Sequence, residues 1–194
     1  VGPGAIGILT GMIYRYMGCE KLIFTGRSDE KLKRAKEITG ADEVLNVKDL
    51  SVEERICKIR EMTGGGAHIV INCANNPQSC IEALQMVRKL GTYVEIGNAM
   101  EDENAPKYEI NIGDVIFSRN AHITSVVANS PKSFNRAFRL LKKYKEIPFE
   151  KVFTHEFHSL EELLPHLKKM KDVDYVKSVL VFEEDADENE DSSN

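Results

Sequence analysis

The residues with the clearest potential for chemistry are the glycines at the start of the chain. Gly2, Gly4 and Gly7 match the G-x-G-x-x-G pattern of a dinucleotide-binding turn. In that pattern the first glycine allows a tight turn, the second lets a pyrophosphate approach the backbone, and the third lets helix and strand pack closely. A helix that begins here would aim its unpaired N–H groups, those of Ala5 and Ile6 among them, at the phosphates. The pattern also fits an ordinary tight turn, so the surrounding elements must decide.

The residues after the next expected strand indicate which dinucleotide would bind. An Asp or Glu at that point bonds the ribose hydroxyls of NAD and repels the 2′-phosphate of NADP. Gly26 stands there instead, 19 positions after Gly7, and Arg27 and Ser28 follow it. The guanidinium can take a phosphate through charge-assisted bonds, Ser28 can add a hydroxyl donor, and Lys31 can reach the same region. The sequence therefore favours NADP over NAD, with a solvated arginine on an exposed turn as the alternative.

Hydrophobic periodicity and turn residues predict the elements that would position these groups. The expected strands are 21–25, 43–47, 68–74, 92–97, 122–128 and 177–182. The expected helices lie around 6–17, 29–39, 52–62, 81–90, 113–117, 134–141 and 160–167. Ser28 or Asp29 would cap the second helix, with the Asp29 carboxylate facing the helix backbone.

The alternation of strands and helices predicts an α/β fold, a doubly wound parallel sheet of the Rossmann type. The near-continuous apolar run at 68–74 is typical of a parallel strand buried on both faces. The first strand of such a sheet is central, and only Val1 of it is present. We therefore expect a truncated first strand and a chain that is the C-terminal part of a longer protein.

Composition narrows the classes of function. Among the 194 residues, 42% are hydrophobic and 29% charged, as is usual for a soluble globular protein, and the net charge of −5 gives no reason to expect nucleic-acid binding. No apolar run approaches the ~20 residues that span a bilayer. Cys19, Cys57, Cys73 and Cys80 form no C-x-x-C pair, so we expect no metal site, buried thiols and a reducing cytoplasm.

Five stretches carry a resemblance to a known family. They are Gly2–Gly7, Gly40–Asp42, Thr63–Ala67, Leu90–Gly97 and Val176–Phe182. Their order resembles the C-terminal, nucleotide-binding part of the medium-chain dehydrogenases/reductases, the zinc-type alcohol dehydrogenases and their relatives. The resemblance implies hydride transfer between a nicotinamide ring and an alcohol or carbonyl substrate. It also implies that a GroES-like domain upstream of Val1 holds the catalytic zinc ligands and most of the substrate pocket, so no catalytic residue or metal ligand is assigned to this chain.

The resemblance also predicts a domain organisation and further cofactor contacts. Residues 1–128 would form the dinucleotide-binding domain, 129–182 would return to the catalytic domain, and 183–194 would be an acidic disordered tail. Cys73 and Ala74 would flank the cofactor, because ligands bind outside the carboxyl ends of the strands. The residues that we expect to bind the cofactor are Gly2, Gly4, Ala5, Ile6, Gly7, Gly26, Arg27, Ser28, Lys31, Cys73, Ala74, Gly97, Asn98, Ser125, Val126 and Lys177.

Two other functions remain open at this level. A sensor or regulatory module could bind NAD(P)H without catalysis, and another Rossmann-type enzyme, such as a methyltransferase, could use the same glycine turn for a nucleoside. The order of the dehydrogenase-like stretches argues against the second. The family commonly forms dimers through an edge strand, for which Ile123–Val127 is the candidate. We expect no nucleic-acid or membrane partner.

Overall fold

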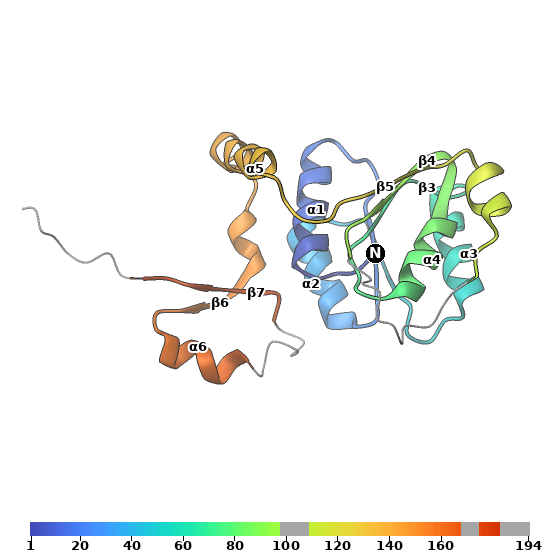
Figure 1. Ribbon diagram of the computed structural model, residues 1–194. Helices are drawn as coiled ribbons and strands as arrows, with labels where there is room; N and C mark the ends of the chain where they lie inside the picture. Colours follow the sequence, from blue (N-terminus) through green and yellow to red (C-terminus); the bar gives the residue numbers. More distant parts are fainter. Residues whose placement is uncertain (98–108, 168–174, 183–194) are drawn as a thin grey trace, which may run out of the picture. The chain divides into compact units, whose positions relative to one another are not determined.

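The computed structural model describes residues 1–97, 109–167 and 175–182. The chain divides into two compact units, Val1–Phe149 and Glu150–Asn194. The first unit contains α1 (Ala5–Tyr16), β1 (Ile23–Gly26), α2 (Asp29–Thr39), β2 (Glu43–Asn46), α3 (Val52–Thr63), β3 (Ala67–Asn72), α4 (Pro77–Met86), β4 (Val87–Glu95), the π-helical turn η1 (Gly113–Phe117), β5 (His122–Ser125) and α5 (Pro131–Lys143) (Figure 1). The short helix η2 (Phe149–Val152) crosses the boundary, and β6 (Phe153–Phe157), α6 (Leu160–His166) and β7 (Lys177–Leu180) belong to the second unit.

The strands of the first unit form two parallel groups. β1 pairs with β2, and β4 pairs with both β3 and β5. Val1 lies between the groups: its amino group donates to the Ile71 carbonyl (2.8 Å), and the Cys73 N–H donates to the Val1 carbonyl (2.9 Å). The Gly2 N–H donates to the Thr25 carbonyl of β1 (2.9 Å). The order β2-β1-Val1-β3-β4-β5, with helices between successive strands, confirms the predicted doubly wound parallel fold.

A cavity of about 730 Å³ lies between the facing edges of β1 and β3. Apolar side chains line it from both sides, including Phe24 of β1, Ile69 and Ile71 of β3, and Met62 of α3. Ile69 is 44% exposed as a result. The expectation that this strand is buried on both faces is therefore wrong for its first half, and the strand ends at Asn72, before the predicted end.

Local capping explains where the helices begin and end. Ser51 and Glu54 form a capping box at the start of α3, and the Ser28 hydroxyl accepts a backbone N–H in the first turn of α2. Gly40 and Gly64 follow α2 and α3 with φ of 65° each, a left-handed conformation that favours glycine. These ends agree with the boundaries predicted from the turn residues.

The junction between α4 and β4 differs from the prediction. The expected helix runs to Leu90, but α4 ends at Met86 and β4 begins at Val87. The Arg119 guanidinium donates to the carbonyls of Gln85 (2.6 Å) and Val87 (2.9 Å), and the Leu90 N–H donates to the Arg119 carbonyl (2.8 Å). These contacts bind the backbone at the junction and favour the earlier start of the strand.

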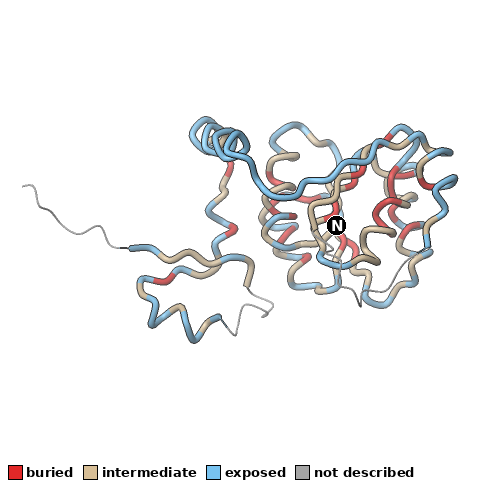
Figure 2. The backbone as a smooth tube through the Cα atoms, in the orientation of Figure 1, coloured by how far each residue is buried: buried red, intermediate tan, exposed pale blue. Residues whose placement is uncertain are grey.

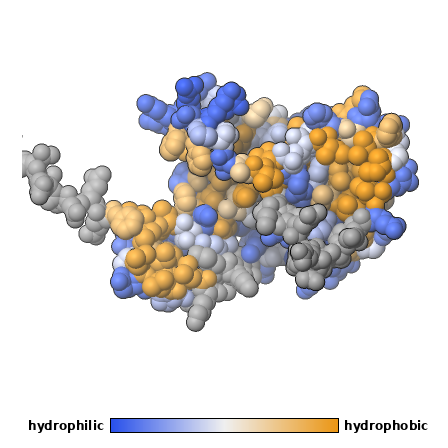
Figure 3. Space-filling model, in the orientation of Figure 1, coloured by the Kyte–Doolittle hydropathy of each residue, from blue (hydrophilic) through white to orange (hydrophobic). Residues whose placement is uncertain are grey.

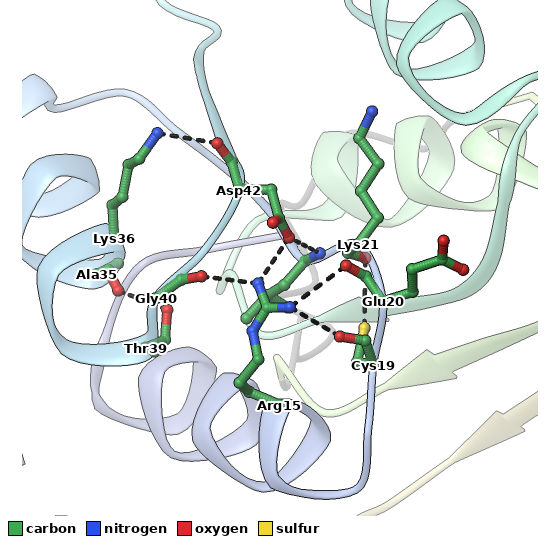
Figure 4. Close-up of polar contacts among 10 residues, drawn as sticks. Arg15, Cys19, Glu20, Lys21, Ala35, Lys36, Thr39, Gly40 and Asp42 are labelled. Atoms are coloured by element: carbon green, nitrogen blue, oxygen red, sulfur yellow. Dashed lines mark hydrogen bonds and ion pairs between the residues drawn. The ribbon is translucent and has the colours of Figure 1, made fainter.

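Arg15 ties together three segments around the C-terminal end of α1 (Figure 4). Its guanidinium donates to the carbonyls of Cys19 (2.8 Å) and Gly40 (2.7 Å) and pairs with the Asp42 carboxylate (2.6 Å). The same carboxylate accepts the Leu22 N–H (2.7 Å). The Leu22 N–H and then the Arg15 guanidinium lower the pKa of Asp42 below its ordinary value. The end of α1, the start of β1 and the turn before β2 are thus held in one arrangement.

The hydrophobic core lies in the first unit, where most buried residues occur (Figure 2). Its main cluster comprises Leu45, Ile56, Ile59, Val70, Ala83, Leu84, Met86, Val87, Tyr93 and Val115. In the described part of the second unit, Val152 and Phe157 are the buried residues. Apolar side chains gather on the visible face of this unit (Figure 3). Within the unit, Leu164 is 59% exposed.

Two further expectations need correction or stay open. The cysteines are not uniformly buried: Cys57 is exposed, and Cys19, Cys73 and Cys80 are half-buried. The structure divides after Phe149, whereas the functional boundary at residue 128 stays a prediction.

The predicted disordered tail, residues 183–194, lies outside the described residues. Among the helices that are described, none is long and apolar enough to cross a membrane.

Candidate functional site

The glycine turn is folded tightly onto the start of α1. Gly2 has φ of 93°, and a Cβ added at Gly7 would lie 2.0 Å from the Gly2 carbonyl oxygen. A side chain at either position would therefore strain or displace the turn. Gly4 differs, because a Cβ there would meet no atom within 4 Å. The surface beside Gly4 is consequently open, while Gly2 and Gly7 are packed together.

The N-terminus of α1 presents unpaired backbone N–H groups. The first helical hydrogen bond runs from the Ile8 N–H to the Gly4 carbonyl (2.9 Å), so the N–H groups of Ala5, Ile6 and Gly7 precede it. No described side chain caps this end, and the first turn contains no acidic residue. The positive end of the helix dipole and these N–H donors can therefore bind an anion from solution.

The end of β1 contacts the glycine turn. A Cβ added at Gly26 would lie 2.7 Å from the Pro3 ring, so only a glycine allows this approach. Arg27 follows on the surface, and within the described residues its side chain makes no hydrogen bond or ion pair. The guanidinium is thus available to a ligand beside the turn.

The two residues after Arg27 are engaged differently from the prediction. The Ser28 hydroxyl donates to the Glu30 carboxylate (2.9 Å) and accepts the Lys31 N–H (3.3 Å), so its hydrogen is already used. The Asp29 carboxylate accepts from the Asn46 amide at the end of β2 (2.8 Å) and does not cap the helix backbone as expected. Ser28 fills the cap position, and its hydroxyl accepts the Lys31 N–H in the first turn of α2.

The turns after β3 and β4 meet beside the glycine turn. A Cβ at Gly2 would lie 3.1 Å from the Ala74 nitrogen and 3.1 Å from the Cys73 carbonyl carbon. A Cβ at Gly97 would lie 2.1 Å from the Ala74 carbonyl oxygen. Cys73 and Ala74 therefore lie between Gly2 and Gly97. The structure brings these predicted residues together at the carboxyl ends of β3 and β4, next to the N-terminus of α1.

The remaining predicted residues are less closely grouped. Ser125 ends β5 and is exposed, and the Val126 N–H donates to the Glu95 carbonyl (2.9 Å), which places both beside the end of β4. Lys177 lies exposed on β7 in the second unit. Asn98 lies outside the described residues. The predicted contacts of Asn98 and Lys177 with a cofactor stay predictions.

A polar network beneath these turns was not predicted from the sequence. It joins Asn72, at the end of β3, to Glu95 and Tyr93 of β4 and to Cys80 of α4. Burial raises the pKa of the Tyr93 hydroxyl and of the Cys80 thiol above their ordinary values. The available signal was an Asn at the end of β3 and a Glu at the end of β4, each next to apolar residues. Such residues in a buried strand need partners that only the tertiary fold identifies.

Metal ligands are not assembled in the part of the chain that the structure describes. No group of three or more His, Cys, Asp or Glu residues lies close enough to hold a metal ion there. The described residues therefore do not fit a zinc site, and no role for zinc is assigned to them.

Comparison with known proteins identifies the family. The model of the zinc-binding dehydrogenase family matches residues 5–143, so the chain belongs to this family. The resemblance to the zinc-type alcohol dehydrogenases that the sequence motifs suggested is thereby confirmed. The matched range begins at Ala5, so it includes Ala5, Ile6 and Gly7 of the glycine turn but not Gly2 or Gly4. Of the other described candidate residues, Lys177 lies outside it.

Individual relatives agree with the family match. The chain is 25% identical over 158 residues to a sorbitol dehydrogenase from Halalkalibacterium halodurans, which covers 80% of this chain and 43% of that protein. It is similar to the crystal structure of an alcohol dehydrogenase from Thermotoga maritima, with a TM-score of 0.77, 27% identity and coverage of 94% of this chain and 48% of that one. An alcohol dehydrogenase from Escherichia coli CFT073, determined with NADH, has a TM-score of 0.72 and 24% identity, covering 93% of this chain and 50% of that one. The chain thus spans about half the length of these relatives.

Proposed function

We propose that the first unit binds a nicotinamide dinucleotide as part of an NAD(P)-dependent oxidoreductase acting on an alcohol or carbonyl compound. The observation that carries this proposal is the N-terminus of α1, where the N–H groups of Ala5, Ile6 and Gly7 lack helical partners beside the open surface at Gly4. That combination suits a pyrophosphate. Membership in the zinc-binding dehydrogenase family and the NADH bound to one structural relative support the choice of ligand.

The other candidate residues extend the site along the strand ends. Cys73 and Ala74 would flank the adenosine and its ribose, and Gly97 with the end of β5 would lie toward the nicotinamide. The nicotinamide supplies or accepts the hydride when it is bound. The described residues bind and orient the dinucleotide, and the substrate groups belong to parts of the protein outside them. Dimer formation through the exposed edge strand β5 is part of the same proposal.

NADP is the favoured dinucleotide. Gly26 places no carboxylate where the 2′-phosphate would lie, and the exposed Arg27 guanidinium can bond that phosphate. Lys31, in the first turn of α2, adds positive charge nearby. The carboxylate of Glu30 is the opposing feature, because Ser28 holds it in the same turn (2.9 Å). A 2′-phosphate would compete with Glu30 for the Ser28 hydroxyl.

The test is a titration of the protein with NADPH and with NADH, followed by nicotinamide fluorescence. Arg27→Ala should weaken NADPH binding by about tenfold or more, as for a lost hydrogen bond to a charged group, and leave NADH binding nearly unchanged. Lys58→Ala, which removes an exposed positive charge from α3, is the matched control and should affect neither. Equal weakening of both nucleotides by Arg27→Ala would refute the NADP preference, and a failure of the unaltered protein to bind either would refute the proposed function.

A further inference from the structure

The carboxylate of Glu95 is held by hydrogen bonds from three directions. The Asn72 amide donates to both of its oxygens (3.2 and 3.0 Å), the Gly97 N–H donates to Oε1 (2.8 Å), and the Tyr93 hydroxyl donates to Oε2. Glu95 ends β4, and Gly97 is in the turn that follows it. A half-buried charge with this many donors is fixed in place, because each bond to an ionised group is stronger than a neutral one.

Asn72 connects this carboxylate to the turn after β3. Its side chain is fully buried, and its Oδ1 accepts the Ala74 N–H (3.3 Å) and the Ser79 hydroxyl (3.2 Å). The Ile96 N–H donates to the Asn72 carbonyl (2.9 Å). The turn after β3 and the turn after β4 are therefore joined by this backbone bond and by the side-chain pair of Asn72 with Glu95.

Tyr93 and Cys80 support the carboxylate from the core. Tyr93 is 2% exposed, and its oxygen lies 3.2 Å from the Cys80 Sγ. The Tyr93 hydroxyl has one hydrogen, and it donates that hydrogen in its bond to the Glu95 carboxylate. The Cys80 thiol is therefore the donor to the Tyr93 oxygen. Because burial raises the pKa of both groups, both keep their hydrogens at neutral pH. The chain from Cys80 through Tyr93 to Glu95 is thus satisfied at each step.

We propose that Glu95 is a positioning residue for the dinucleotide site, acting through the two turns that it joins. The turns approach so closely that a Cβ at Gly97 would lie 2.1 Å from the Ala74 oxygen, and Ala74 in turn lies against Gly2. The carboxylate pulls the Gly97 N–H and, through Asn72, the Ala74 N–H toward the same point. These bonds fix the separation of the two turns, and the proposed dinucleotide would lie across both of them. The inference rests on the proposed function for the identity of the ligand.

Glu95→Gln tests this role with little change in shape. A glutamine has one acceptor oxygen and an NH₂ group, so at least one of the three donors must lose its partner. Binding of NADH and of NADPH should weaken by the same factor, about tenfold. The reason is that the two turns would contact the part of the dinucleotide that NADH and NADPH share. Tyr93→Phe, which removes one donor, should weaken both by a smaller common factor. Glu43→Gln, at an exposed position of β2, is the matched control and should leave both unchanged.

Hydrogen exchange in the ligand-free folded protein supplies an independent readout. The Gly97 and Ala74 amides should exchange faster in Glu95→Gln, while the amides of α2 keep their rates. A variant that melts at a lower temperature yet keeps both nucleotide affinities and both exchange rates would overturn the proposal, as would unequal weakening of NADH and NADPH. If Glu95→Gln does not fold, Tyr93→Phe decides by the same criteria. If the unaltered protein binds neither nucleotide, the proposed function fails, whereas the exchange rates still decide whether Glu95 positions the turns.

Discussion

At the scale of single residues, glycines of the same motif serve different purposes. Gly7 is required by packing, because a Cβ there would overlap the Gly2 carbonyl oxygen at 2.0 Å. Gly4 has no such neighbour within 4 Å, and its φ of −89° is open to any residue. The structure itself therefore does not demand a glycine at position 4. A ligand that approaches the backbone there would.

This difference gives a paired prediction. Gly4→Ala should lower the free energy of unfolding by less than about 1 kcal/mol, the usual cost of a poorer N-cap, but should weaken dinucleotide binding markedly. Gly7→Ala should lower stability by several kcal/mol, as expected for a clash with backbone. Urea unfolding and nucleotide titration measure the two effects. Normal affinity in Gly4→Ala would show that the ligand does not lie against this residue.

Sequence reasoning at this scale succeeded where a residue acts on its own backbone. The glycine turn and the Ser28 cap depend on local conformation, and both were predictable. The partners of Asp29 and Glu95 were not, since Asn46 and Asn72 lie 17 and 23 residues away along the chain. Such pairs depend on which strands are neighbours and in which register, and a single sequence contains no direct record of either.

At the scale of elements, the contacts of Arg15 fix how α1, β1 and the turn before β2 meet. The pKa of Asp42 is lowered in the folded protein. The ionised carboxylate therefore stabilises the fold at pH values above 3.8, the ordinary pKa of an Asp side chain. That stabilisation is lost as the pH falls through the lower, folded-state value. The Asp42 side chain is 42% exposed, so solvent limits the size of the effect.

Asp42→Asn should therefore cost roughly 0.5–1 kcal/mol of stability at pH 7, and the difference from the unaltered protein should shrink as the pH falls below about 3.8. Denaturant unfolding at a series of pH values provides the measurement. Asp49→Asn, at an exposed position, removes the same charge without these partners and should show a smaller change at pH 7. A deficit for Asp42→Asn that is constant from pH 7 to pH 2 would contradict the argument.

Element boundaries were predictable where capping residues mark them and not where a distant side chain sets them. Gly40 and Gly64 end their helices as the sequence suggested. The end of α4 depends on Arg119, which is 34 residues from Gln85, the carbonyl that it binds. Periodicity continued through Leu90 because buried strand and helix positions look alike over a few residues.

At the scale of the whole molecule, the two units differ in how much they bury. The described part of the second unit buries only Val152 and Phe157, whereas the first contains an extended core. Regions with few buried contacts open more readily than the global fold. Amides of β6 and β7 should therefore exchange hydrogen much faster than those of β4, as hydrogen-exchange mass spectrometry would measure. Equal protection of β4 and β7 would contradict this ordering.

The family match agrees with the resemblance predicted from the sequence. That prediction rested on the order of the glycine turns and strands along the whole chain. The matched residues 5–143 span the parallel fold and α5. The relatives are about twice as long as this chain, so substrate groups could not be predicted from these residues. The position expected for a nucleotide follows from strand direction and helix polarity, and it stays a prediction.

The cavity between β1 and β3 has a consequence for behaviour at high concentration. Beyond Val1 and Gly2, the facing edges of these strands have backbone groups without a neighbouring strand in the described residues, and apolar side chains such as Ile69 flank them. Open apolar edges are templates for pairing between molecules and for aggregation. A net charge of −5 on 194 residues offers modest repulsion against it. Covering this seam should therefore reduce self-association of the chain at high concentration.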